Sequence, residues 1–243
     1  MKTTSSIRAD LIALAIGCFV IFSCQTTVLT GQAVKESRNV PSFDGVALAF
    51  SGDIFITQGS PQKVVIEAEK STLEIIETEV EGSNLILRIK RSHWGNLGEI
   101  NAYITLPDIS QLSVSGSGDM ICETDIKTQD IKLEVSGSGS IRISKLEANE
   151  INAVVTGSGD ISVTGAGNEQ NELDATITGS GSIKASEMPV GEANVTITGS
   201  GSATVNVLKE LETNITGSGS VLYKGNPMVN ANATGSGKTK SLK

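Results

Sequence analysis

The C-terminal half of the chain alternates apolar and polar residues with a period of two. Between residues 111 and 223, short runs place apolar side chains at every second position, and each run precedes or follows a Gly-Ser-Gly triplet. A period of two is typical of β-strands, because successive side chains point to opposite faces of a sheet. We therefore expect pairs of short strands that meet at each triplet.

The triplet recurs at regular intervals. Seven copies begin at Gly116, Gly137, Gly157, Gly179, Gly199, Gly217 and Gly235, so the successive spacings in the numbering are 21, 20, 22, 20, 18 and 18. One such repeat cannot bury its own apolar face, whereas stacked repeats bury a continuous core. The sequence predicts an all-β fold: a right-handed parallel β-helix, or β-solenoid, with one Gly-Ser-Gly corner per coil of 18–22 residues.

The inward positions of these coils form files of mostly aliphatic residues. One file contains Met120, Ile141, Ile161 and Ile183, and the neighbouring file begins with Cys122. We therefore expect Cys122 to be a small buried residue rather than a reactive thiol. The outward columns are polar or β-branched without a charge cluster, which favours a flat surface over a small-molecule pocket.

Residues 38–110 contain strand-like runs without the regular triplet. The run 51–56 resembles a degenerate copy of the repeat, and further runs cover 64–68, 84–89 and 102–106. Residues 71–79 are expected to form a helical turn capped by Ser71. We interpret 38–110 as irregular β coils that close one end and continue into the regular solenoid repeats of 111–243.

Residues 1–23 have the pattern of an export signal. Two basic residues precede an apolar run from Leu11 to Phe22, which is too short for a membrane-spanning helix, since such a helix needs about 20 apolar residues. The run Ile21-Phe22-Ser23-Cys24 resembles the lipobox of bacterial lipoproteins, which implies lipidation of Cys24 after cleavage. Residues 24–37 have no sustained period and are expected to form a tether.

These features predict an exported protein. We expect an outer membrane lipoprotein that faces either the periplasm or the cell surface, with the membrane as a partner through the lipid anchor. After cleavage, Cys122 would be the one cysteine besides the lipidated Cys24. No intrachain disulfide is therefore expected, although the compartment is oxidising.

Composition argues against several other functions. The chain has 19 Lys and Arg against 27 Asp and Glu, a net charge of −8, so it lacks the basic field that nucleic-acid binding requires. With His93 as its single histidine, multi-histidine metal sites are not expected, and neither is a cofactor. His93 and Trp94 are the candidate contact for a partner, an unidentified protein or polysaccharide.

A carbohydrate-active enzyme is the main alternative function. Asp119 and Asp160 each follow a triplet and lie two coils apart, so their backbones should be about 9.6 Å from each other, near the upper limit for an inverting glycosidase. Arg88-Ile89-Lys90 matches the Arg-x-Lys element of polygalacturonase-like enzymes, but their other motifs are absent. We expect both aspartates to be turn residues.

A calcium-dependent module is a further alternative. Gly-Ser-Gly-Asp partly resembles the nonapeptides of calcium-binding β-rolls, but serine replaces the acid in most coils. The predicted ligands are too few for that site.

Several ordered landmarks carry a family resemblance. They are the segments 38–46, 56–59 and 104–109, the last leading into Leu112–Asp119. Together they resemble the head GIN domain family, also called auto-transporter adhesins, over about residues 38–240. The resemblance implies a secreted or lipid-anchored β-helical protein without established catalytic residues. We therefore expect a non-catalytic, lipid-anchored envelope protein, adhesion-like or scaffolding, with a carbohydrate-active enzyme or polysaccharide-binding protein as the alternative.

Overall fold

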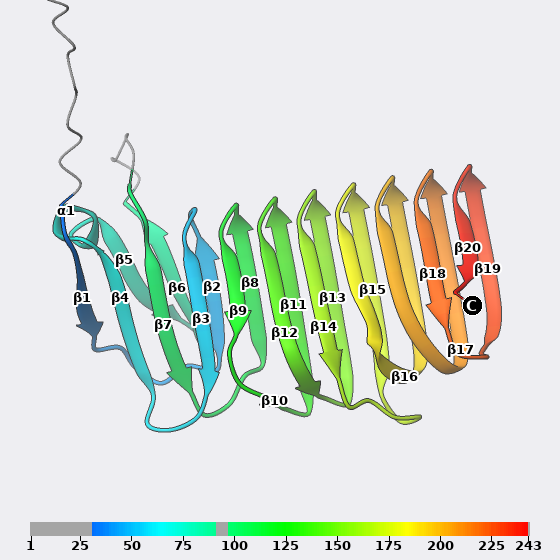
Figure 1. Cartoon of the computed structure of the whole chain (residues 1–243), viewed down its shortest axis with the longest axis horizontal. Coiled ribbons are helices and arrows are strands. Elements are labelled where there is room, and N and C mark those ends of the chain that lie inside the picture. The colour runs from blue at the N-terminus through cyan, green and yellow to red at the C-terminus, as the bar shows by residue number, and fades with distance from the viewer. Residues whose placement is uncertain (1–30, 91–96, 243) are drawn as a thin grey trace, which may run out of the picture.

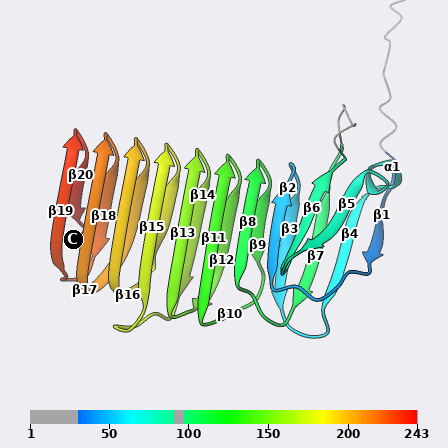
Figure 2. The same cartoon turned by 180° about the vertical axis from the view of Figure 1, so that it is seen from behind.

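Strand pairs that meet at the Gly-Ser-Gly corners stack into a β-solenoid (Figure 1). The computed structural model describes residues 31–90 and 97–242. Each coil runs along one face, turns at a corner, returns along a second face and closes through a third side. The coils advance in the right-handed sense, as the front and back views show (Figures 1 and 2). The predicted fold class is confirmed.

The strands of the first face end at the corner glycines. They are β8 (Gln111–Gly116), β11 (Asp130–Gly137), β13 (Glu150–Gly157), β15 (Glu172–Gly179) and β19 (Met228–Gly235). The strands of the second face start after the corner and are β9 (Asp119–Cys122), β12 (Ser140–Glu147), β14 (Asp160–Gly165), β18 (Ser220–Lys224) and β20 (Lys238–Ser241).

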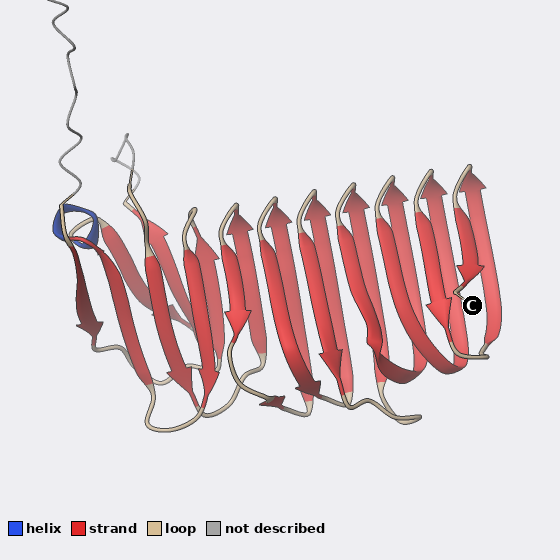
Figure 3. Ribbon diagram, in the orientation of Figure 1, coloured by secondary structure: helices blue, strands red, loops and turns tan. Residues whose placement is uncertain are grey.

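The remaining side closes each coil, and we call it the connector side. It contains loops and the short strand β10 (Ile126–Lys127) in the longer coils. Later in the chain, β16 (Ser182–Gly199) and β17 (Ser202–Gly217) continue as strands from the second face round to the first (Figure 3).

The coils stack in register, so equivalent residues lie above one another. Ile141 pairs in parallel with Met120 below it and Ile161 above it. The file Met120, Ile141, Ile161 and Ile183 is at most 1% exposed and forms part of a continuous core. Cys122 lies in the neighbouring file, and burial raises the pKa of its thiol to about 12. Its predicted role as a small buried residue is confirmed.

The corners require glycine because the coils approach closely there. Gly137 has a φ of 131°, and a Cβ atom at this position would lie 2.4 Å from the carbonyl oxygen of Gly116. The main chain of Ser138 donates a hydrogen bond of 2.9 Å to the same oxygen. Positive φ and backbone contact both exclude a side chain.

The N-terminal end contains the irregular elements. They are β1 (Ala33–Arg38), β2 (Gly45–Ala49), β3 (Asp53–Gln58), β4 (Lys63–Glu69), α1 (Lys70–Leu73), β5 (Ile76–Glu81), β6 (Asn84–Ile89) and β7 (Asn101–Leu106). The strand order is β5-β6-β2-β8 on the first face and β1-β4-β7-β3-β9 on the second.

This end differs from the predicted succession of coils. The coil formed by β2 and β3 lies between the coil of β6 and β7 and that of β8 and β9, so spatial order departs from chain order. The outermost pairings, β5 with β6, and β4 with both β1 and β7, are antiparallel. Antiparallel neighbours need no crossover connection, which lets a short segment close the end of the stack.

Two local predictions at this end also need correction. The helical turn is shorter than 71–79: α1 covers Lys70–Leu73, its N-cap is Glu69, and no side chain caps it. The predicted tether 24–37 extends too far, because Ala33–Arg38 forms β1 on the edge of β4. β1 is almost entirely exposed, and its sequence has no apolar period. Main-chain pairing with β4 therefore holds this strand in place.

At the C-terminal end, the stack stops at a regular coil with few large apolar side chains. The inward positions of the last coil carry Val229, Ala231, Ala233, Thr239 and Ser241. Thr213 in the coil below is buried and shares a 2.8 Å hydrogen bond with Thr239. All of β19 is exposed. Within the described residues, no helix is long and apolar enough to span a membrane.

Candidate functional site: a polar groove on the connector side

Two cavities, of about 550 and 430 Å³, meet on the connector side. Asp108 lines both, so the two cavities are neighbours along the solenoid axis, and together we call them the connector groove. Its walls are loops that link the second face of one coil to the first face of the next, together with the β3–β4 and β5–β6 turns at the N-terminal end. These loops form the lower edge of the molecule in Figure 1.

A column of polar side chains lines the larger cavity. It consists of Asp108, Gln129, Asn149 and Asn171, and the spacings between them are 21, 20 and 22. These spacings equal those of the first four triplets, and each residue precedes its triplet by eight positions. In these four successive coils the solenoid therefore stacks one polar side chain at the same place.

The column retains hydrogen-bonding capacity. The side-chain amide of Asn149 donates a 2.6 Å hydrogen bond to Oε1 of Gln129. Gln129 Nε2 and Asn149 Oδ1 have no partner within the described part of the chain, and the Asp108 carboxylate has neither a hydrogen bond nor an ion pair there. All three residues are exposed, so donors and acceptors are both available to a ligand.

The loop 166–171 forms one wall and is fixed by buried contacts. Asn171 is 5% exposed, donates a 2.5 Å hydrogen bond to the carbonyl of Ala148, and accepts one from the main chain of Asn168. A Cβ atom on Gly167 would lie 1.8 Å from the carbonyl oxygen of Pro189. Lys209 donates a 2.7 Å hydrogen bond to the carbonyl of Glu169. These contacts tie the loop to the coils on either side of it.

A glutamine supports the middle of the groove. Gln58 Nε2 donates to the carbonyls of Pro107 and Lys127, at 3.0 and 2.9 Å, and Gln58 Oε1 accepts from the main chain of Lys127 at 2.7 Å. One side chain therefore links the connectors of two coils.

Acidic side chains outnumber basic side chains along the groove. Lys127 forms a 2.8 Å ion pair with Glu147, and this hydrogen bond raises the pKa of Lys127. Asp108 and Asp44 remain as additional acidic residues along the groove.

The two candidate aspartates lie elsewhere, at the corner, on the column Asp119-Ser140-Asp160-Ser182. Ser140 donates to Asp119 at 2.7 Å, and Ser182 donates to Asp160. Arg142 pairs with Asp119 at 2.7 Å and Lys184 with Asp160 at 3.2 Å. As predicted, Ser140 lies between Asp119 and Asp160 in this column.

Their ionisation does not suit a general acid. Burial favours the neutral form of Asp119, but hydrogen bonds from Arg142 and Ser140 outweigh it and lower its pKa. At Asp160, burial likewise favours the neutral form, but hydrogen bonds from Ser182 and Lys184 outweigh this effect and lower the pKa. A glycosidase acid needs a raised pKa.

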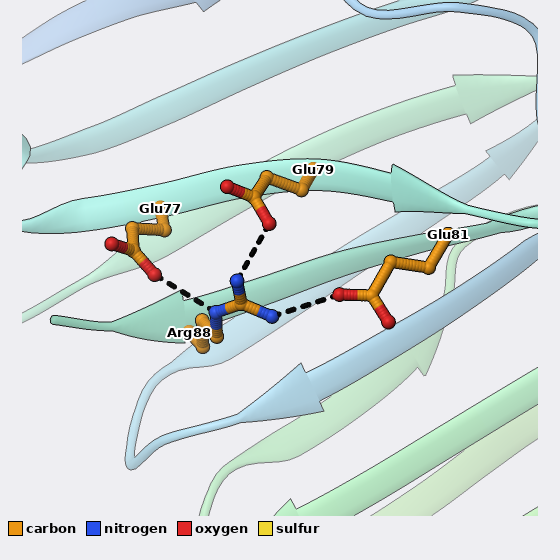
Figure 4. Close-up of polar contacts among 4 residues, drawn as sticks. All are labelled: Glu77, Glu79, Glu81 and Arg88. Carbon is orange, nitrogen blue, oxygen red and sulfur yellow. Dashed lines mark hydrogen bonds and ion pairs between the residues drawn. The ribbon is translucent and has the colours of Figure 1, made fainter. Parts of the chain in front are cut away.

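Arg88 lies on the outer face of β6 and contacts three glutamates of β5 (Figure 4). Its guanidinium group is 2.8 Å from Glu77, 2.6 Å from Glu79 and 2.9 Å from Glu81. Hydrogen bonds to these carboxylates raise the pKa of Arg88. The Arg-x-Lys match therefore forms a surface ion-pair cluster on an edge hairpin.

The other residues predicted from the sequence are not placed. The lipidation residue Cys24 and the candidate contact residues His93 and Trp94 lie outside the described residues. Within 31–90 and 97–242, no group of three or more His, Cys, Asp or Glu side chains is arranged to hold a metal ion.

Sequence reasoning missed the connector groove. Its signal was present, because the column recurs at the triplet spacing. The four members differ in residue type, however, and apolar periodicity does not detect a column of acid and amides on a loop.

The stacked coils and the connector groove define a β-solenoid repeat protein whose candidate binding groups lie on its outer surface. The chain belongs to the family described as "Putative auto-transporter adhesin, head GIN domain", whose family model matches residues 42–227. The predicted resemblance is therefore confirmed. No curated protein matches the chain.

Solved structures share the fold. A crystal structure from Bacteroides fragilis, described as a putative adhesin, has a TM-score of 0.80 and 22% identity, covering 87% of this chain and 97% of that one. One from Parabacteroides distasonis, described as a putative lipid binding protein, has a TM-score of 0.72 and 23% identity, covering 88% and 98%. One from Parabacteroides merdae, described as a putative adhesin, has a TM-score of 0.69 and 21% identity, covering 88% and 97%.

Proposed function

We propose that this protein is a non-catalytic, lipid-anchored module of the bacterial envelope with an adhesion or scaffolding role. The observation that carries the proposal is the pair of long outer faces, built from in-register columns of mostly polar side chains over successive coils. Such faces suit broad contact with a large partner, because a small-molecule site needs a concave surface with converging groups. Membership of an adhesin-like family supports the same role.

The non-catalytic part of the proposal rests on the corner aspartates. Each is held by a serine and a basic residue, and each has a lowered pKa. A hydrolase using Asp119 or Asp160 would release reducing ends from a polysaccharide panel and lose this activity in Asp119→Asn or Asp160→Asn. We expect no release above background.

The lipid anchor would attach at the closed end of the solenoid. β1 begins at Ala33 beside β4, which lies at that end. The stretch from Cys24 to Gly31 can span at most about 24 Å. An anchor at Cys24 would therefore keep the closed end near the membrane.

The anchor is tested by fractionating cells that express the full-length protein. Cys24→Ser should move the protein from the membrane fraction to the soluble fraction. The matched control is Cys122→Val, which changes the buried cysteine and should leave the protein in the membrane fraction. Equal membrane association of the Cys24→Ser variant would contradict lipidation at this residue.

The adhesion role is tested with whole cells. A strain lacking the protein should be retained less than the parent on mucin-coated glass or on a layer of its own cells, and full-length protein should restore retention. Equal retention on both surfaces would contradict an adhesion role.

A further inference from the structure

We propose that the connector groove binds a neutral polysaccharide chain that lies along the solenoid axis. This inference rests on the proposed adhesion role and deepens it, because it assigns a ligand class and a site. Four properties of the groove support it: length, chemistry, charge and rigidity.

The groove is elongated along the axis. Hydrogen bonds of 2.7 to 3.0 Å connect the main chains of successive connectors, including Asp44 to Ser83, Ser110 to Asp44 and Asn149 to Gln129. From Ser83, in the turn between β5 and β6, to Asn171 the two cavities of the groove span six levels of the stack, and five steps of about 4.8 Å give about 24 Å. This length suits a linear polymer better than a compact metabolite.

The side chains suit sugar hydroxyls. A hydroxyl group both donates and accepts hydrogen bonds, as does the amide side chain of Gln129 or Asn149, while the free Asp108 carboxylate accepts two or more. The apolar residues that line the larger cavity are Ala148 and Ala166 alone. An apolar peptide would find little surface to cover there.

Charge favours a neutral chain. Asp44, Asp108 and Glu147 outnumber Lys127, which is itself paired with Glu147. Nucleic acids and acidic polysaccharides would therefore be repelled. Peptide addition as an extra strand is also disfavoured, because the connectors present turns whose main-chain groups are paired between coils, not a free strand edge.

The groove is organised before any ligand binds. The buried Asn171 amide fixes the wall loop, and Gln58 joins two connectors. A rigid site avoids the entropic cost of ordering its side chains and loops on binding. Repeated contacts along a polymer would then add to one another.

The test uses the full-length protein purified from envelopes in detergent. The probes are neutral hexasaccharides of β-1,4-glucose, β-1,4-mannose and α-1,4-glucose, with hexagalacturonate and hexalysine as charged comparisons, all measured by calorimetry. We expect a neutral hexasaccharide to bind with a Kd below about 1 mM, ahead of both charged probes.

Groove variants locate the binding. Gln129→Ala and Asn149→Ala should each weaken binding about three- to tenfold, the effect of losing one or two hydrogen bonds. The isosteric Asp108→Asn removes an acceptor and should also weaken it. The matched control is Asn194→Ala, an exposed asparagine on the first face whose amide contacts Asp174. It should bind like wild type. All four residues are exposed, so the melting temperature should be preserved.

Three results would overturn the proposal: no binding to any neutral hexasaccharide, equal binding by groove and control variants, or preference for hexalysine. These outcomes are distinct from failure of the adhesion role. If cells carrying Asn149→Ala are retained normally, adhesion does not depend on the groove. If a strain lacking the protein is retained normally, the adhesion role is contradicted, whatever the groove binds.

Discussion

Single residues at the corners determine how closely two coils can approach. The first glycine of each triplet combines a positive φ with a carbonyl oxygen of the neighbouring coil, as at Gly137. Directly after the first four triplets, aspartate and serine alternate in one column, and the serine hydroxyl donates to the carboxylate in the pairs Ser140-Asp119 and Ser182-Asp160. The glycine permits stacking, and these polar pairs join adjacent coils at the same edge.

Gly137→Ala should lower the free energy of unfolding by at least about 2 kcal/mol, because the new Cβ atom would meet the Gly116 oxygen in a strained backbone conformation. Gly59→Ala is the control. Its nearest neighbour would be Thr105 Cγ2 at 3.7 Å, an ordinary contact, so its stability should change by less than about 0.5 kcal/mol. Chemical denaturation measures both. Equal stability of the two variants would contradict a steric role for the corner.

The corner aspartates should make stability depend on acidic pH. Their pKa values are lowered from 3.8, so the folded protein binds protons less readily than the unfolded chain. Their contribution is present above the ordinary pKa and is lost as the pH falls through the lowered values. The double variant Asp119→Asn, Asp160→Asn should lose less unfolding free energy between pH 6 and pH 3 than wild type. Denaturant titrations at both pH values test this, and an unchanged difference would refute it.

At the scale of elements, the strands of the closed end depend on pairings between segments distant in the chain. The runs corresponding to β3, β4, β6 and β7 were predictable, because each has its own pattern of apolar positions. Their order was not, because the insertion of β2 between β6 and β8, and of β3 between β7 and β9, leaves the alternation within each strand unchanged. β1 was missed for a related reason: an exposed edge strand needs no apolar face.

The edge strand β5 should depend on Arg88. Removing its charge with Arg88→Gln leaves three glutamates close together on one strand, so β5 should exchange its amide hydrogens faster while the regular coils remain protected. High salt should reduce the difference by screening the repulsion.

Hydrogen exchange with mass spectrometry resolves this local effect. Lys132→Gln is the matched control, because Lys132 pairs with the single carboxylate of Glu134 on the central strand β11. It should leave exchange in β5 unchanged. Faster exchange throughout the solenoid in Arg88→Gln would show that the hairpin is not an independent element.

For the whole molecule, each regular coil contacts mainly its two neighbours, so stability is close to a sum over coils. The regular region was predictable in fold and register because its inward files repeat with each triplet, as Met120, Ile141 and Ile161 show. The connector groove was not, because its column joins loops whose residue types differ. Periodicity reveals a shared apolar core more readily than a shared polar position.

Deleting residues 137–156 should remove one coil and preserve the fold. Gly137 pairs with Gly157, so joining Ser136 to Gly157 keeps every later residue in register. We expect cooperative unfolding and an unchanged circular dichroism per residue. Deletion of 137–146 removes half a coil, breaks the register and should prevent folding. A soluble, cooperative half-coil deletion would contradict additive stacking of whole coils.

The connector loops of the coils also set the length of the connector groove. The coils between the first four triplets, together with connectors of the N-terminal end, supply the loops of the groove, whereas β16 and β17 cross the connector side as strands without such a loop. Duplication of a coil that carries such a loop would therefore extend the groove by about 4.8 Å, and loss of such a coil would shorten the groove by the same amount. Such a chain can serve as a molecular ruler whose reach evolves in whole steps while its interior stays the same.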